Sequence, residues 1–130
     1  MDSLNIEATK YTPQIFFDTT TNTVILKGES YPENTFEFYK PFFEWLNGYF
    51  DLEESGELVI NVDLIYFNSS SSKILFNLFD LLDAAAKNGR TVSINWIFDE
   101  EDEDYLEFGE EFAEDMEHVS FNLVPQKSEE

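Results

Sequence analysis

The chain has 130 residues and no cysteine, and 42% of its residues are hydrophobic. This length allows one domain with a sizeable core, and the lack of cysteine excludes disulfides, thiolate nucleophiles and Cys-ligated metals. With 28 acidic and 7 basic residues the formal net charge is −21, so phosphate backbones and anionic lipid surfaces would repel the protein, and we expect neither a nucleic-acid partner nor a membrane partner.

The N-terminal part of the chain predicts a loose lead-in followed by a β-hairpin. Residues 1–5 lack the basic and apolar regions of a signal peptide. Two short β-type runs, at 14–17 and 23–27, flank a turn-like segment at 18–22. No apolar run in the chain approaches the roughly 20 residues that span a bilayer. We therefore expect a cytoplasmic protein that opens with a hairpin.

A helix is expected from Ser30 to about residue 50. Ser30 and Glu33 have the spacing of a capping box, in which each side chain bonds to the backbone N–H of the other residue. Large apolar side chains then recur at spacings of three and four, which predicts one buried stripe. The stripe comprises Tyr39, Phe42, Phe43, Leu46 and Phe50.

The rest of the chain alternates strands with helices. A strand, a helix, a strand, an acidic helix and a last strand are predicted at 57–67, 70–87, 91–98, 101–116 and 118–124. The first of these strands is so apolar that we expect it to be central and covered on both faces. The order ββαβαβαβ predicts one α/β domain over residues 1–130 with a mixed, mostly parallel sheet.

A run of polar residues separates the expected central strand from the next helix: Asn68, Ser69, Ser70, Ser71 and Ser72. Asn and Ser are favoured helix caps, which accounts for one or two of these residues. A helix N-terminus also offers free N–H donors and a partial positive charge, so it tolerates a phosphate. A phosphate there would add about −1.5 to −2 charges to the surface, and Lys73 could pair with it. We predict that this segment is a phosphorylation switch.

Three segments carry a resemblance to a known family: residues 28–34 (GESYPEN), 42–46 (FFEWL) and 66–73 (YFNSSSSK). Together with the predicted element order, they resemble the SiaC-type family of bacterial regulatory phosphoproteins. The order itself is similar to the STAS fold of anti-sigma-factor antagonists. The resemblance covers nearly the whole chain, and it implies a STAS-like domain that regulates by binding other proteins.

The resemblance also implies a regulatory cycle. Family members are phosphorylated by a dedicated Ser/Thr kinase on the hydroxyl residue directly after the Asn, which here is Ser69, with Ser70 and Ser71 as alternates. A metal-dependent phosphatase of the PP2C type reverses the modification. The unmodified form binds and activates a diguanylate cyclase of the GGDEF type, which promotes cyclic-di-GMP synthesis and affects biofilm. The residues expected to support the switch loop are Asn68, Ser72 and Lys73.

Aromatic side chains on the two longer predicted helices are candidates for the partner surface, because interfaces favour aromatic residues. These candidates are Phe38, Trp45, Phe76 and Phe79. In a chain with 14 Phe, a place in the core is the stronger expectation for each.

No motif of an enzyme is present, and we expect no catalytic residue, no cofactor and no metal. His118 is the single histidine, and 12 of the 28 acidic residues lie between Asp99 and Glu117. A calcium loop that starts at Asp99 would need glycine where Asp104 stands. Two alternatives stay open: an acidic nucleic-acid mimic that inhibits a basic protein, and a domain that binds a small ligand or metal through its carboxylates.

Overall fold

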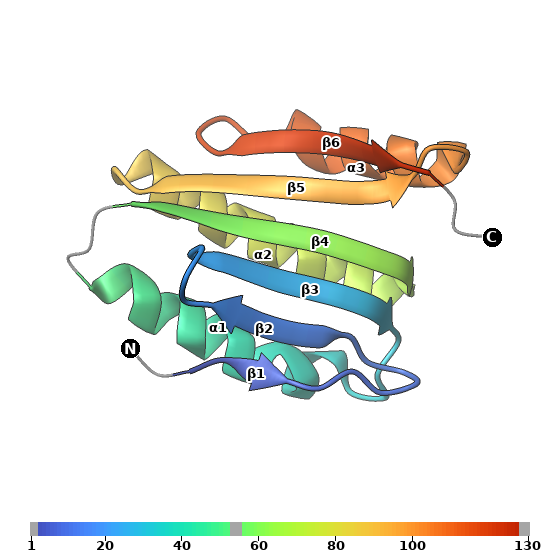
Figure 1. Cartoon of the computed structure of the whole chain (residues 1–130), viewed down its shortest axis with the longest axis horizontal. Helices are drawn as coiled ribbons and strands as arrows, with labels where there is room; N and C mark the ends of the chain where they lie inside the picture. The colour runs from blue at the N-terminus through green and yellow to red at the C-terminus, as the bar shows by residue number, and fades with distance from the viewer. Residues whose placement is uncertain (1–2, 53–55, 128–130) are drawn as a thin grey trace.

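The computed structural model describes residues 3–52 and 56–127, in which one layer of strands is backed by one layer of helices (Figure 1). The elements in chain order are β1 (Asn5–Ile6), β2 (Gln14–Asp18), β3 (Thr23–Ser30), α1 (Thr35–Asp51), β4 (Glu57–Phe67), α2 (Ser69–Lys87), β5 (Thr91–Asp99), α3 (Glu103–Glu114) and β6 (Ser120–Gln126). The predicted order ββαβαβαβ is confirmed, with the short β1 added at its front. A strand of two residues has no periodicity that a sequence pattern can detect.

The described strands form one sheet in the order β1-β2-β3-β4-β5-β6. β1, β2 and β3 pair antiparallel, whereas β3, β4, β5 and β6 run parallel. Each connection between parallel strands leads to the next strand in the same direction along the sheet. Right-handed crossovers of this kind place the three described helices on one face, as Figure 1 shows. The carboxyl ends of the parallel strands and the first turns of the helices therefore lie at one end of the molecule, the right-hand end of Figure 1.

β4 is central, but the expectation that it is covered on both faces is wrong. Leu58, Ile60, Val62 and Leu64 are buried toward the helices, whereas the side chains between them are only partly buried. No described helix covers the second face of the sheet (Figure 1). We call this second face the open face.

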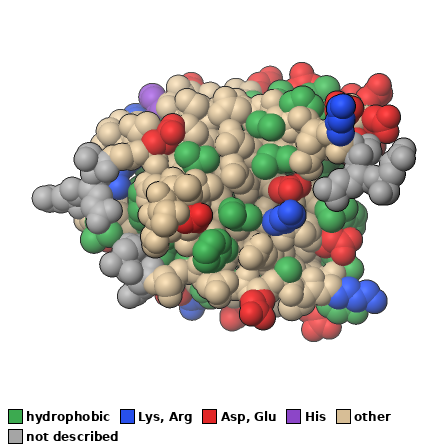
Figure 2. All heavy atoms as spheres, in the orientation of Figure 1, with side chains coloured by type: hydrophobic (Ala, Val, Ile, Leu, Met, Phe, Trp, Pro, Cys, Tyr) green, Lys and Arg blue, Asp and Glu red, His purple; other side chains and the backbone are tan. Residues whose placement is uncertain are grey.

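An asparagine ladder crosses the open face. Asn95 Nδ2 donates to Asn61 Oδ1 at 2.8 Å, and Asn122 Nδ2 donates to Asn95 Oδ1 at 3.0 Å. Figure 2 views this face and shows mostly backbone and uncharged polar side chains, with hydrophobic side chains in small separate groups. The face can meet water because its polar positions bond to one another across neighbouring strands.

The core between sheet and helices is rich in aromatic rings, as the 14 Phe predict. Toward β2, the ring centroids of Phe17 and Trp45 lie 4.7 Å apart, and Trp45 stacks on Tyr49 at 5.4 Å. Toward β5, the centroids of Trp96 and Phe112 lie 5.2 Å apart. Among the described residues, no helix combines the length and apolarity that crossing a bilayer requires.

α1 begins later than predicted. Its N-cap is Asn34, whose Oδ1 accepts from the backbone N–H of Glu37 at 3.1 Å. The capping box predicted at Ser30 is wrong, because β3 continues through this residue. Two residues of the predicted stripe, Phe43 and Phe50, are only partly buried. The buried residues of α1 are Tyr39, Phe42, Trp45, Leu46 and Tyr49.

Two helix glycines form a test of this packing. A Cβ on Gly109 of α3 would lie 2.5 Å from Trp96 Cδ1, whereas a Cβ on Gly48 of α1 would have nothing within 4 Å. Gly109→Ala should lower the free energy of unfolding by about 1–3 kcal/mol because it overpacks the core. Gly48→Ala should raise it by up to about 1 kcal/mol through helix propensity. Urea-unfolding curves measure both variants, and equal stabilities would contradict the close approach of α3 to Trp96.

Candidate functional site

The predicted switch segment lies at the carboxyl end of β4, where α2 begins. Asn68 is the N-cap of α2, and its Oδ1 accepts from the backbone N–H of Ser71 at 2.9 Å. The Asn68 carbonyl accepts from the backbone N–H of Ser72 at 2.9 Å. Ser69 is the first residue of α2, so its backbone N–H has no carbonyl acceptor within the helix. The expected supporting role of Asn68 thus has a geometric basis.

The four serines occupy different environments. Ser69 and Ser70 are exposed, Ser72 is partly buried and the side chain of Ser71 is 0% exposed. A kinase cannot reach a fully buried hydroxyl, so the expectation of Ser71 as an alternate phosphorylation site is wrong. Lys73, in the first turn of α2, is exposed. The structure leaves Ser69 and Ser70 as the two accessible hydroxyls at the head of the helix.

The buried hydroxyl of Ser71 belongs to a network that we call the hydroxyl clamp: Ser30, Tyr39 and Ser71. Ser71 Oγ donates to the Ser30 carbonyl at 2.9 Å. Ser30 Oγ lies 2.7 Å from Ser71 Oγ and 2.6 Å from the hydroxyl oxygen of Tyr39. Since the proton of Ser71 goes to the carbonyl, Ser30 must donate to Ser71 and Tyr39 must donate to Ser30.

This one-way chain of donors requires a protonated Tyr39. Burial raises the pKa of Tyr39 to about 12, although its hydrogen bond with Ser30 acts in the opposite direction. The phenol is therefore neutral at physiological pH and can donate. The described residues contain no buried side-chain nitrogen or oxygen without a hydrogen-bond partner, so the clamp satisfies its polar groups completely.

The clamp joins three elements beside Ser69. Ser30 ends β3, Tyr39 lies in α1 and Ser71 lies in the first turn of α2. The Ser30 carbonyl also accepts from the backbone N–H of Asn68 at 3.1 Å. The start of α2 is thus fixed from both sides, and Ser69 is presented to solvent from a rigid support.

Ser30 and Tyr39 are part of this site although their local sequence patterns do not predict it. Ser30 has the spacing of a helix cap, and Tyr39 fits the apolar stripe of α1, so both have a simpler local interpretation. Their partner Ser71 is 41 residues from Ser30. The available signal was that two of the three segments of the family resemblance, 28–34 and 66–73, each contain a member of the clamp.

The aromatic residues predicted as a partner surface belong mainly to the core. Trp45 and Phe79 are 7% and 0% exposed, so their assignment to a surface is wrong. Phe38 and Phe76 are partly buried and pack against the core, Phe76 with its ring centroid 4.5 Å from that of Phe112. These four aromatic side chains face inward because α1 and α2 pack against the sheet on this side.

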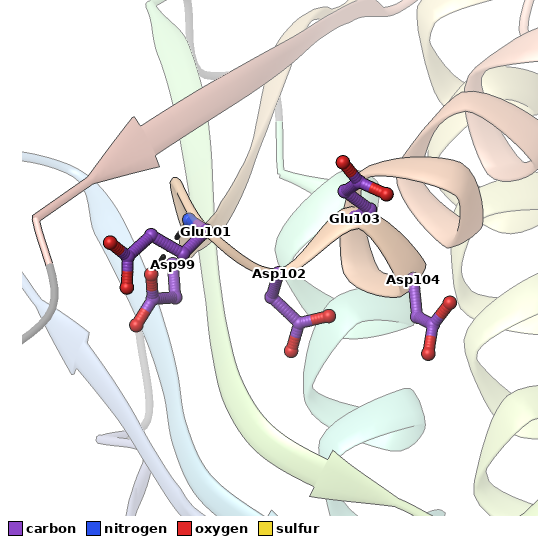
Figure 3. A pocket seen from close by; sticks show the side chains of 5 residues that line it. All are labelled: Asp99, Glu101, Asp102, Glu103 and Asp104. Carbon is purple, nitrogen blue, oxygen red and sulfur yellow. Dashed lines mark hydrogen bonds between the residues drawn. The ribbon is translucent and has the colours of Figure 1, made fainter.

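The acidic segment before and within α3 forms a shallow pocket whose carboxylates do not converge (Figure 3). Asp102 Oδ1 caps α3 by accepting from the backbone N–H of Tyr105 at 3.1 Å, and Asp99 Oδ1 accepts from that of Glu101 at 2.9 Å. Within residues 3–52 and 56–127, no group of three or more His, Cys, Asp or Glu side chains is placed to hold a metal ion. The acidic-mimic alternative stays a prediction.

Removal of the Ser71 hydroxyl tests the clamp. Ser71→Ala leaves the buried Ser30 hydroxyl without its acceptor, and we expect it to lower the free energy of unfolding by about 1–3 kcal/mol. Ser70→Ala, one residue away and exposed, should change it by less than about 0.5 kcal/mol. Thermal or urea unfolding compares the two variants. The clamp would be refuted if both serines could be replaced without loss.

Comparisons with known proteins identify the family of this chain. A model of the SiaC family of regulatory phosphoproteins matches residues 6–126. An uncharacterised protein of Pseudomonas aeruginosa strain UCBPP-PA14 is 35% identical over 130 residues, which cover both chains completely.

Solved structures have the same fold. The crystal structure of apo-SiaC from Pseudomonas aeruginosa superposes with a TM-score of 0.82 at 33% identity, over 97% of this chain and 99% of that chain. A chain in the crystal structure of the diguanylate cyclase SiaD in complex with its activator SiaC, from the same species, gives 0.83 at 34% identity, over 96% and 99%. The STAS-like α/β expectation thus matches the SiaC fold, and this protein belongs to the SiaC family of regulatory phosphoproteins.

Proposed function

We propose that the chain is a non-enzymatic switch whose unphosphorylated form binds and activates a diguanylate cyclase of the GGDEF type. Membership of a family of regulatory phosphoproteins supports the first part. The complex of the relative SiaC with the cyclase SiaD, in which SiaC is named as the activator, supports the second. A Ser/Thr kinase and a PP2C-type phosphatase would control the switch in opposite directions.

We propose Ser69 as the phosphorylated residue. The observation that carries this choice is the exposed Ser69 hydroxyl at the first position of α2, directly after the capping Asn68. A phosphate at this position lies near the positive end of the helix dipole and near backbone N–H groups that α2 leaves free. Ser70 is also exposed and is the alternate site.

The physical effect of the phosphate would be mainly a change of surface charge. It adds about −1.5 to −2 charges at pH 7, at the end of the molecule where the three helices begin. The clamp lies beneath Ser69 and is already satisfied by its own hydroxyls. The domain would therefore keep its fold while a docked partner meets a new dianion.

Phosphoserine incorporated during translation tests this function without a kinase. Phosphoserine at position 69 should reduce cyclase activation at least tenfold relative to the unmodified chain, because the proposed function places the dianion at the contact with the cyclase. Phosphoserine at position 120 is the matched control, since Ser120 is exposed and starts β6 at the opposite end of the parallel strands. The measurement is cyclic-di-GMP formation by purified SiaD, with SiaC of Pseudomonas aeruginosa as the positive control. Equal activation by the two phosphorylated forms would argue against Ser69.

A further inference from the structure

Large exposed apolar side chains gather at one end of the molecule. Within the described residues there are five: Tyr11, Phe36, Ile65, Tyr66 and Phe108. Four of them lie in the loop before β2, at the start of α1 or at the end of β4, and therefore at the carboxyl end of the parallel strands. Single exposed apolar residues scattered over a surface need no explanation, but a gathered set marks an interaction site.

Two members of this set, Tyr11 and Tyr66, lie on either side of the partly buried Tyr31. The ring centroids of Tyr11 and Tyr31 lie 5.2 Å apart, and those of Tyr31 and Tyr66 lie 5.6 Å apart, both edge to face. Ile65, next to Tyr66, is 72% exposed, the highest value among the large apolar residues that the structure describes. We call Tyr11, Tyr31, Ile65 and Tyr66 the tyrosine patch.

The backbone holds the tyrosine patch in place. Gly28 of β3 pairs with Leu64 and Glu29 pairs with Tyr66, so Ile65 is the extra residue of a β-bulge. The Tyr105 hydroxyl donates to the Ile65 carbonyl at 2.7 Å. In addition, the backbone N–H of Tyr31 donates to the Tyr11 carbonyl at 2.8 Å. Bulges turn side chains away from the regular pleat, and a preorganised patch loses little freedom when a partner binds.

Acidic side chains border the tyrosine patch. Glu29 of β3 pairs with Tyr66 of the neighbouring strand β4. Burial raises the pKa of Tyr31, and the negative charge of Glu29 raises it further. Ile65 also lines a groove that contains Asp63, Asp99 and Asp102 together with Lys27 and Lys127. Figure 2 shows acidic side chains gathered at the upper right, at the same end of the molecule. With a net charge of −21, this surface complements an apolar segment flanked by basic side chains.

The tyrosine patch adjoins the switch. Tyr66 is followed by Phe67, which pairs with Ser30 of the clamp, and then by Asn68 and Ser69. A phosphate on Ser69 therefore stands at the border of the patch, beside carboxylates that are already present.

We infer that the tyrosine patch is the surface on which the cyclase docks, through an apolar segment of the cyclase flanked by basic residues. This inference rests on the proposed function. A phosphate on Ser69 acts on this contact directly, because it adds a hydrated dianion where rings and aliphatic groups are to be buried. Aromatic side chains at the centre of an interface carry most of its affinity.

Binding of purified SiaD, measured by calorimetry or biolayer interferometry, tests the inference with SiaC of Pseudomonas aeruginosa as the positive control. Tyr66→Ala and Ile65→Ser should each weaken binding at least tenfold and leave the thermal midpoint close to that of the unchanged chain, because both side chains are exposed. Asn122→Tyr adds bulk to the open face and is the control, expected to bind within twofold of the unchanged chain.

The outcomes separate this inference from the function on which it rests. Unchanged affinity in both patch variants overturns the docking surface, and so does a loss of affinity in Asn122→Tyr alone, which would move docking to the open face. If Ser69→Asp weakens binding while both patch variants bind normally, the result supports Ser69 as the switch and refutes the tyrosine patch as the docking surface. If the unchanged chain fails to bind SiaD while SiaC binds, the proposal of a cyclase partner is refuted. The inference that a cyclase segment docks on the tyrosine patch is then refuted as well.

Discussion

Three buried hydroxyls fix the position of the proposed switch residue, Ser69. Ser30, Tyr39 and Ser71 hydrogen-bond in one direction and end on the Ser30 carbonyl, which also receives the backbone N–H of Asn68. An unsatisfied hydroxyl in a core costs free energy, so the three groups are stable there only together. Their bonds tie the end of β3 and α1 to the first turn of α2. Ser69 is exposed because the side chain of Ser71, two positions later in the helix, is held toward the core.

The proposed switch, built on such a junction, would act through a change of surface charge and not through a change of shape. Parallel strands and helices on one face bring every helix N-terminus to the same end of the molecule, capped by Asn34, Asn68 and Asp102. That end also carries the tyrosine patch and its acidic border. A phosphate there is compatible with its own helix and unfavourable for an apolar contact next to it. The same position therefore suits both the proposed modification and its expected effect on a partner.

The sequence predicts the elements of this fold well because their patterns are local. The apolar strand 57–67, the amphipathic helix after it and the Asn68 cap can each be derived from nearby residues. Four identical serines do not show locally which of them is buried. Ser71 is buried because its position on the helix directs it inward and because its partner Ser30, 41 residues away, lies there. Asn61 and Asp63 interrupt the apolar run of β4 at alternate positions, which indicates in part that helices cover only one face of this strand. The bulge that displays Ile65 depends on its register with β3, which one strand alone does not encode.

Amide hydrogen exchange in the protein with phosphoserine at position 69 tests the central claim most directly. Three amides report on the junction: Asn68 N–H bonds to the Ser30 carbonyl, and the N–H groups of Ser71 and Ser72 bond to Asn68. If the clamp supports the switch without moving, the protection of these amides stays within a few-fold of that in the unmodified chain. Loss of their protection by tenfold or more on phosphorylation would show that the start of α2 opens, and would contradict the account.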